Sequence, residues 1–176
     1  MNTISLKRKA FAAEDDCTLQ QGLETMADAH GKQILRYCSG ILRDYHEAQD
    51  VVQDTFIKAL IKKSSIKGEL APWLYRTAYN KCIDILRRRK WLCFFTEEQS
   101  HTAGYNVEDS MGEEIRAALG VLSPEDRALV ISRAMDDLDY EQLALIYGAS
   151  PPTLRKRYER AKKKLASALR EQGLEV

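Results

Sequence analysis

The sequence predicts an all-α protein of two small helical domains joined by a flexible acidic linker. Apolar residues recur at intervals of three and four over most of the 176 residues, which is the spacing of helices with one buried face. No segment shows the alternation of apolar and polar residues that indicates a strand. Residues 96–114 hold six acids and no lysine or arginine, with Gly, Ser and Thr among them. We expect them to be the linker between domains at 1–95 and 115–176.

The composition favours a folded protein that does not enter a membrane. Hydrophobic residues make up 44% of the chain and charged residues 30%, as in globular proteins. No apolar run approaches the roughly 18 residues of a membrane span, and the first residues lack a signal-peptide core, so we expect a cytoplasmic location. The four cysteines show no C-x-x-C spacing and have no paired histidines nearby. We therefore predict buried thiols, no metal and no other cofactor.

Three apolar stripes predict three helices in the first domain. They consist of Leu23, Met26, Ala27, His30, Ile34, Tyr37, Cys38 and Ile41; of Ala48, Val51, Val52, Thr55, Phe56, Ala59 and Leu60; and, after Pro72, of Leu74, Ala78, Cys82 and Ile85. Opposite the second stripe lie Asp50, Gln53, Asp54, Ile57 and Ile61. Exposed isoleucines among acids indicate a docking surface for a basic, helical protein partner. The alternative is an ordinary surface, because single exposed apolar residues are common.

The outer face of the third stripe combines an aromatic ring and an amide with arginines. It carries Trp73, Arg76, Thr77, Asn80, Asp84, Arg87 and Arg88. Stacking rings with amide and guanidinium donors suit unpaired bases, because every unstacked base offers a π-face. The alternative is that Trp73 packs against a neighbouring helix and that "RRRK" merely solvates a helix end, where cations are favoured by the dipole.

Capping residues predict three helices in the second domain. Ser123 and Pro124 start the first helix, whose stripe is Ala128, Ile131, Met135 and Leu138. Asp139 with Gln142 forms a capping box for a short helix that Gly148 ends in the left-handed conformation. Ser150 then caps a long basic helix with two prolines in its first turn, where a missing N–H costs no intrahelical bond. The last two helices form a helix-turn-helix pattern.

The long helix presents its charges opposite its apolar stripe. The stripe is Leu154, Tyr158, Ala161, Leu165 and Ala168, and the other side carries Pro152, Lys156, Glu159, Arg160 and Lys163, with Arg155 on the flank. Arginine and lysine reach guanine edges in a major groove, and glutamate accepts from cytosine. This face is therefore predicted to read duplex DNA. A solvated basic helix is the alternative.

Three blocks of the sequence resemble, in order and at the expected separations, the extracytoplasmic-function sigma factors, a small two-domain class that directs bacterial RNA polymerase to promoters. "EAQDVVQDTFIKAL" resembles the family's region 2.2, "APWLYRTAYNKCIDILRRRK" its regions 2.3 and 2.4, and "LSPEDRALVISRAMDDLDYEQLALIYGASPPTLRKRYERAKKKL" its regions 4.1 and 4.2. The resemblance implies a sigma region 2 helical bundle over 1–95 and a sigma region 4 helix-turn-helix domain over 115–176.

The resemblance also implies partners and site residues. A sigma factor would bind the clamp helices and flap of core RNA polymerase, thread its linker towards the RNA exit path, and open the promoter without making or breaking a bond. An anti-sigma factor would sequester it. The implied polymerase-binding residues are Asp50, Gln53, Asp54, Ile57 and Ile61. The implied residues for binding single-stranded minus-ten DNA are Trp73, Arg76, Asn80, Lys81, Asp84, Arg87 and Arg88. The loop "SSIKGEL" before them would take part in the same contact. The implied residues for the minus-thirty-five duplex are Thr153, Arg155, Lys156, Arg157, Glu159, Arg160 and Lys163.

The polymerase alone would then set the spacing of the two domains.

Two other classes of protein are alternatives. A dimeric helix-turn-helix regulator would bind duplex DNA without polymerase, but residues 1–95 show no dimerisation element or ligand pocket. A nuclease could use Glu47, Asp50 and Asp54 to hold a metal, but acids at this spacing usually form a solvated helix face, and no histidine or lysine motif supports them.

Overall fold

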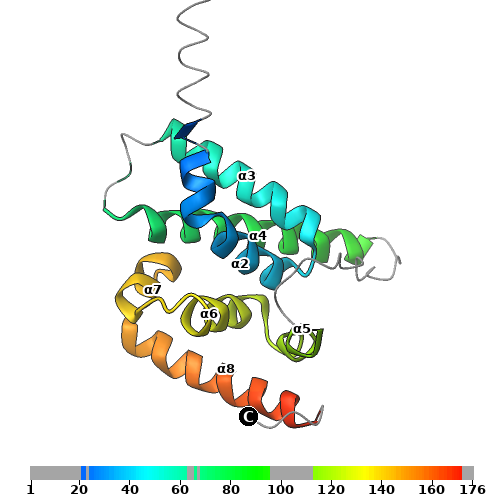
Figure 1. Ribbon diagram of the computed structural model, residues 1–176. Helices are drawn as coiled ribbons and strands as arrows, with labels where there is room; N and C mark the ends of the chain where they lie inside the picture. Colours follow the sequence, from blue (N-terminus) through cyan, green and yellow to red (C-terminus); the bar gives the residue numbers. More distant parts are fainter. Residues whose placement is uncertain (1–20, 23, 63–65, 67, 96–112, 172–176) are drawn as a thin grey trace, which may run out of the picture.

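The computed structural model describes residues 21–171 except 23, 63–65, 67 and 96–112 (Figure 1). Every regular element among these residues is a helix, which confirms the all-α prediction. The elements are η1 (Ala27–Gly31), α2 (Lys32–Leu42), α3 (Tyr45–Ile61), α4 (Leu70–Phe95), α5 (Glu113–Leu119), α6 (Pro124–Ala134), α7 (Tyr140–Tyr147) and α8 (Pro151–Glu171). They form two helical domains, η1 to α4 and α5 to α8. The predicted linker lies outside the described residues except for its last two, which begin α5.

The N-terminal domain packs α2, α3 and α4 through the predicted apolar stripes. The α2 helix ends at Leu42 because Arg43 adopts the left-handed conformation at φ 58° and its N–H donates to the Ser39 carbonyl. The α3 helix begins after Asp44, whose carboxylate accepts a hydrogen bond from the Glu47 N–H at 2.9 Å. The prediction for Ala27 was wrong: it is exposed in η1, a π-helical turn whose wider winding shifts the register.

The helix starts predicted in the C-terminal domain are confirmed. The Ser123 hydroxyl accepts from the Asp126 N–H at 3.1 Å, with Pro124 in the first turn of α6. Asp139 and Gln142 form the reciprocal capping box of α7. Gly148 ends α7 at φ 65°, a conformation that strains residues with a Cβ. A short turn then leads into α8, which completes a helix-turn-helix unit.

The double proline begins α8, as predicted. The helix runs from Pro151, and the Ser150 carbonyl accepts its first intrahelical bond from the Leu154 N–H at 3.0 Å. Within the predicted stripe, Leu154, Ala161 and Ala168 are buried, and Tyr158 and Leu165 are half-buried. The stripe predicted for α6 is wrong at Met135, which is exposed because that helix ends one residue earlier.

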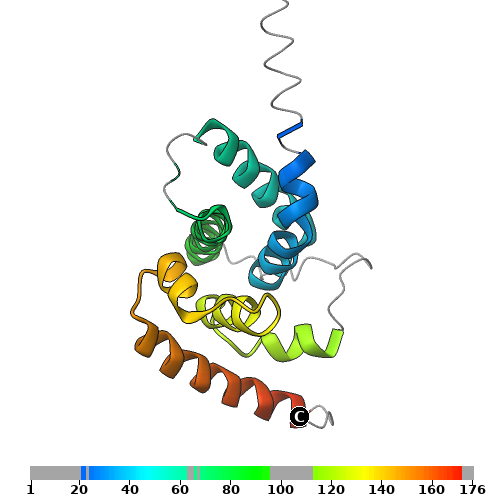
Figure 2. The same cartoon turned by 60° about the vertical axis from the view of Figure 1, so that its left-hand side comes forward.

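The two domains lie directly against each other, with α6 on α2 and α7 on α4 (Figures 1 and 2). Buried side chains from both domains belong to one continuous apolar cluster. The rings of Tyr79 and Tyr147, one from each domain, meet edge to face at 4.9 Å between centroids. Helix α8 packs mainly on α5, α6 and α7, on the far side of its domain. The expectation that only the polymerase brings the domains into a fixed relation was therefore wrong, because their side chains also do so.

Candidate functional site

The outer face of α8 is a surface of exposed charged and polar side chains. It holds six of the seven residues predicted to contact duplex DNA, namely Thr153, Arg155, Lys156, Glu159, Arg160 and Lys163. The opposite side of the helix packs on α6 and α7, so these side chains share the solvent side of one helix. Their accessibility is confirmed, and their contacts with DNA stay a prediction.

Two arginines of α8 are held in place by neighbouring helices. The half-buried Arg157 donates from Nε to the Asp126 carboxylate at 2.6 Å, which ties α8 to the first turn of α6. The Arg155 guanidinium lies 5.1 Å from the centroid of the Tyr140 ring, a cation–π contact with the start of α7. Arg155 is thus oriented within the free protein, whereas Arg157 must exchange an ion pair to reach a phosphate.

A pocket of about 290 Å³ lies between the outer faces of α3 and α4. It is lined by Lys58, Lys62, Trp73, Thr77, Asn80, Lys81 and Asp84. The half-buried Trp73 ring packs against the core and forms part of the lining, and Asn80 is exposed. The structure thus brings together four of the residues predicted to bind minus-ten DNA. It adds Lys58 of α3 and Lys62, the residue after that helix, which sequence reasoning missed because only the packing of α3 on α4 places them there.

An ion pair joins this pocket to the predicted polymerase surface. The Lys81 ammonium donates to the Asp54 carboxylate at 2.9 Å, and this hydrogen bond lowers the pKa of Asp54 below its usual value. Both side chains remain close to half exposed, so the pair adds little stability. The ion pair instead holds Asp54, on the predicted polymerase surface, against Lys81, which lines the pocket.

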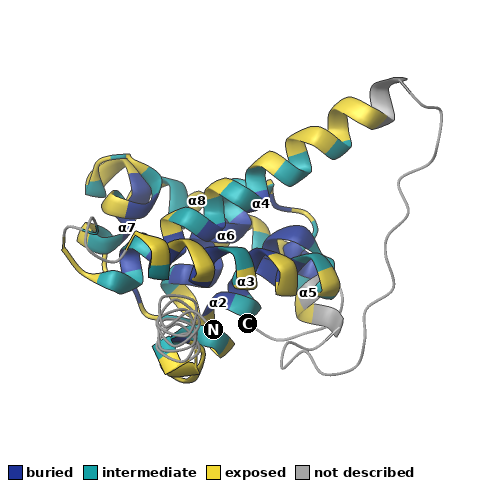
Figure 3. Cartoon of the chain, turned by 90° about the horizontal axis from the view of Figure 1, so that it is seen from above, coloured by how far each residue is buried: buried dark blue, intermediate teal, exposed yellow. Residues whose placement is uncertain are grey.

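The remaining arginines of the predicted minus-ten set lie apart from the pocket. Arg76 reaches the other domain, where its guanidinium donates to the Leu145 carbonyl at 3.4 Å. Arg87 and Arg88 are exposed on the last turns of α4, which project from the body of the protein (Figure 3). Arg87 donates to Asp84 one turn earlier at 3.2 Å. The structure therefore presents an exposed basic extension of α4 beyond the pocket.

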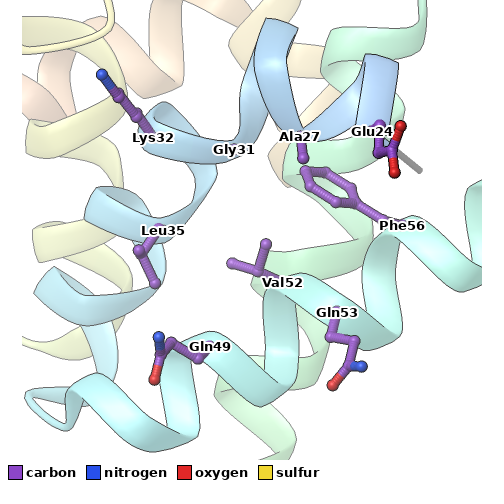
Figure 4. Close-up of a pocket in the computed structure, with 9 residues that line it drawn as sticks. All are labelled: Glu24, Ala27, Gly31, Lys32, Leu35, Gln49, Val52, Gln53 and Phe56. Atoms are coloured by element: carbon purple, nitrogen blue, oxygen red, sulfur yellow. The ribbon is translucent and has the colours of Figure 1, made fainter. Parts of the chain in front are cut away.

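The predicted polymerase surface forms the outer side of α3. Asp50 and Gln53 are exposed, Asp54 is half-buried, and Ile57 and Ile61 are 40% and 73% exposed. This confirms that the five side chains are accessible along one helix. A groove of about 590 Å³ runs beside them between α3 and the segment that leads into α2, and Figure 4 shows its lining side chains. They are Glu24, Ala27, Gly31, Lys32, Leu35, Gln49, Val52, Gln53 and Phe56.

The acids considered for a nuclease are partly engaged in ion pairs. Glu47 pairs with Arg89, and Asp54 pairs with Lys81. Within the described ranges, no group of histidine, cysteine, aspartate and glutamate side chains is placed to hold a metal ion. Cys38 and Cys82 are buried free thiols, and burial raises the pKa of the Cys38 thiol well above its usual value. Among the helices that the structure describes, none is both long and apolar enough to span a membrane.

A capped helix-turn-helix on one domain and an aromatic, basic pocket on the other define a two-domain nucleic-acid-binding protein. Residues 26–92 match the family model of sigma-70 region 2, and residues 112–165 match that of sigma-70 region 4. The chain belongs to the extracytoplasmic-function sigma factors of bacterial RNA polymerase, which act as transcription initiation factors at promoters.

Similar proteins agree with this assignment. The ECF RNA polymerase sigma factor SigE of Mycolicibacterium smegmatis is 25% identical, over 94% of this chain and 68% of that protein. SigW of Bacillus subtilis is also 25% identical, over 86% of this chain and 91% of that protein. Among solved structures, the sigma factor RpoE of Bartonella quintana, in complex with the anti-sigma factor NepR, matches with a TM-score of 0.70 and 25% identity. That match covers 86% of this chain and 96% of RpoE.

Proposed function

We propose that this sigma factor reads its promoter with two separate surfaces. The outer face of α8 contacts the minus-thirty-five duplex, and the pocket on α4 holds a base of the separated minus-ten strand. This proposal rests on one observation, which is that the α8 face and the α4 pocket differ in shape and in the kinds of side chain that they present. The α8 face is a convex row of charged side chains suited to a groove, whereas the α4 site is a concave pocket with an aromatic ring suited to an unstacked base.

On the duplex, Arg155, Lys156, Glu159 and Arg160 contact base edges, and Thr153, Arg157 and Lys163 hold phosphates. Cations with two or more donors match the acceptors of guanine, and a carboxylate accepts from cytosine. The stacking of Arg155 on Tyr140 supports a role in base reading, because an oriented guanidinium loses less conformational entropy when it binds.

On the opened strand, Trp73 stacks with a base and Asn80 donates to its edge. Lys81, Lys58 and Lys62 attract the backbone, and Asp84 and Arg76 line the approach. Arg87 and Arg88 extend this basic path along the end of α4. The segment "SSIKGEL", of which residues 64, 65 and 67 lie outside the described residues and Leu70 begins α4, takes part in base capture. Together these contacts offset the few kcal/mol that flipping a base costs, so the chain opens DNA by binding it while the core enzyme supplies the catalysis.

The outer side of α3 docks on the clamp helices of the polymerase through Asp50, Gln53, Asp54, Ile57 and Ile61. An apolar centre ringed by acids and amides supports this role. The C-terminal domain contacts the flap, and residues 96–114 run towards the RNA exit path as a linker. The functional domains are thus 1–95 for polymerase docking and melting, and 115–176 for duplex reading.

We further infer that the protein acts in the bacterial cytoplasm, catalyses no reaction itself, and is sequestered by an anti-sigma factor. The polymerase and the promoter are in the cytoplasm, which supports the location. The structural similarity to RpoE, which was solved with its anti-sigma factor, supports the last inference.

Run-off transcription from a promoter library with core polymerase tests the proposal. We expect promoter-specific transcripts that need this chain, and no effect of the chain on DNA alone. Lys156→Ala should lower transcription from the selected promoters about 5- to 150-fold, from the 1–3 kcal/mol of a base contact. Lys162→Ala is the matched control, because it removes the same charge from an exposed position of the same helix outside the proposed set. Equal losses in both variants would contradict base reading by Lys156.

A further inference from the structure

One aromatic ring of the C-terminal domain contacts two guanidinium groups. The centroid of the Tyr140 ring, at the first residue of α7, lies 5.1 Å from the guanidinium carbon of Arg155 and 5.5 Å from that of Arg133. Both distances fall within the range of about 6 Å over which a cation is attracted to an aromatic ring. The ring therefore connects the end of α6, which carries Arg133, with the second turn of α8, which carries Arg155.

The Tyr140 ring is itself constrained by the backbone and by packing. Asp139 and Gln142 form the capping box of α7 directly around it, which fixes the backbone of the first turn. The ring is half-buried and packs against the apolar core, where α6, α7 and α8 meet (Figure 1). Tyr140 is therefore a fixed platform for the two arginines.

The two arginines differ in how their charge is compensated. Arg133 donates to the Asp137 carboxylate at 2.8 Å. Arg155 contacts the ring but forms no hydrogen bond or ion pair with any described residue. Glu159 lies four positions further along α8, a spacing that brings side chains close together on a helix, yet it does not pair with Arg155. Arg155 is therefore held in place while its N–H donors lack an acceptor in the described part of the chain.

A guanidinium held in this way is suited to a planar partner with two acceptors. An aromatic ring attracts the charge of a guanidinium, which can stack on it and keep its fork of N–H donors free. In a major groove, the O6 and N7 atoms of guanine are the pair of acceptors that fits this fork. Arg155 therefore combines a fixed position with donors that remain available for one base.

The neighbouring side chains of the α8 face lack this support. Lys156, Glu159 and Arg160 are exposed and form no hydrogen bond, ion pair or ring contact with described residues. Immobilising a long, flexible side chain on binding lowers affinity about 2- to 12-fold. A side chain that is already in place avoids much of that loss, so Arg155 should discriminate between bases more strongly than these neighbours do.

We propose that Tyr140 is a specificity-determining positioning residue, whose ring holds Arg155 in the orientation that reads one guanine of the minus-thirty-five duplex. The proposal rests on the proposed function of the α8 face and deepens it, because it assigns recognition of one base pair to residues on two helices. Asp137 supports the arrangement, since it compensates the charge of Arg133 and so reduces repulsion between the two cations beside one ring.

A promoter library that is randomised over the minus-thirty-five element tests the proposal. Transcription by core polymerase with the full chain measures the preference for each base at each position. Arg155→Ala identifies the base pair that Arg155 reads, because the preference for guanine should be lost there and kept elsewhere. Tyr140→Leu should lower the preference at that same base pair about 2- to 12-fold. Tyr140→Phe keeps a ring that attracts cations and should retain most of the preference.

Two controls separate positioning from packing. Tyr158→Leu is the matched control, because it removes another half-buried ring that packs against the core of the same domain and contacts no guanidinium among the described residues. It should leave the base preferences unchanged, even where total transcription falls. In an Arg155→Ala background, Tyr140→Leu should have no further effect at the chosen base pair, because the ring acts through the arginine. Melting temperatures show that each variant is folded.

Each outcome has a distinct meaning. A loss that is confined to the base pair of Arg155 and absent in Tyr140→Phe supports positioning. An equal loss at all positions, the same profile in Tyr158→Leu, a Tyr140→Phe variant as defective as Tyr140→Leu, or a further loss in the Arg155→Ala background would overturn it, even with promoter-specific transcription intact. If Arg155→Ala alters the preference at no position, base reading by Arg155 fails together with this inference. If no promoter-specific transcripts form at all, the proposed function itself fails.

Discussion

Replacing Trp73 with leucine separates its proposed stacking role from its packing role. The ring is half-buried, packs against the core and helps to line the pocket between α3 and α4. Leucine keeps apolar contact with the core but cannot stack on a base. We therefore expect the free energy of unfolding to fall by at most about 2 kcal/mol, while the contact with the flipped base is lost.

The loss of stacking sets the expected size of the effect on promoter opening. Stacking of a base on an aromatic side chain contributes about 1–3 kcal/mol, which corresponds to a factor of about 5 to 150 in the equilibrium constant of the open complex. Trp73→Phe keeps a smaller ring in the same pocket and should retain most of the wild-type activity. Duplex binding by α8 should not change, because the two surfaces lie on different domains.

The assay is the fluorescence of a 2-aminopurine placed in the minus-ten element, which rises when the base unstacks in the open complex. Trp91→Leu is the matched control: it makes the same substitution in the same helix, at a position that is 64% exposed and outside the pocket. If Trp73→Leu and Trp91→Leu impair opening equally, or if Trp73→Phe is as defective as Trp73→Leu, stacking by Trp73 is refuted.

Three further predictions concern the core, the polymerase surface and pH. Leu154→Ala should lower the free energy of unfolding by about 2–5 kcal/mol in urea titrations, because the side chain is 1% exposed; a loss below about 1 kcal/mol would contradict its role in the core. Ile61→Asp should weaken binding to core polymerase without changing the melting temperature, since the side chain is 73% exposed; unchanged affinity would exclude it from the interface. Burial raises the pKa of Asp136, and Arg36 and Tyr75 beside it only partly oppose that rise. The folded state therefore holds the Asp136 proton more tightly than the unfolded state does. This stabilises the fold fully below the ordinary aspartate pKa of about 3.9, and the stabilisation is lost as pH rises through the raised pKa. Unfolding midpoints in urea should show this decline from acid towards neutral pH, and Asp136→Asn should remove it; an identical pH dependence in that variant would count against the assignment.

Local signals in the sequence predicted the helix starts of the C-terminal domain. Ser123, Asp139 and Gly148 act on backbone groups within a few residues of themselves, so their roles can be read without the fold. The accessible face of α8 followed from the same reasoning, because helical spacing alone separates its apolar stripe from its charges. The short helix α5 was missed because it begins inside the acidic, Gly-containing segment.

Contacts between distant residues could not be predicted in this way. Arg127 is 87 positions from Gly40, and its own segment gives no sign that the guanidinium will be buried against another helix. Lys58 and Lys62 join Trp73 only through the packing of α3 on α4. The sequence thus indicated which residues are exposed on each helix, whereas the pocket and the domain interface required their arrangement in space.

The two prolines that begin α8 also affect how the protein responds to ionic strength. A helix normally offers its first N–H groups to a phosphate, but Pro151 and Pro152 have none to give. Contacts with the DNA backbone must then come mainly from cationic side chains of α8. Each lysine or arginine that neutralises a phosphate releases a condensed counterion. Affinity for the upstream element should consequently fall steeply as salt increases, which makes this contact sensitive to the osmotic state of the cell.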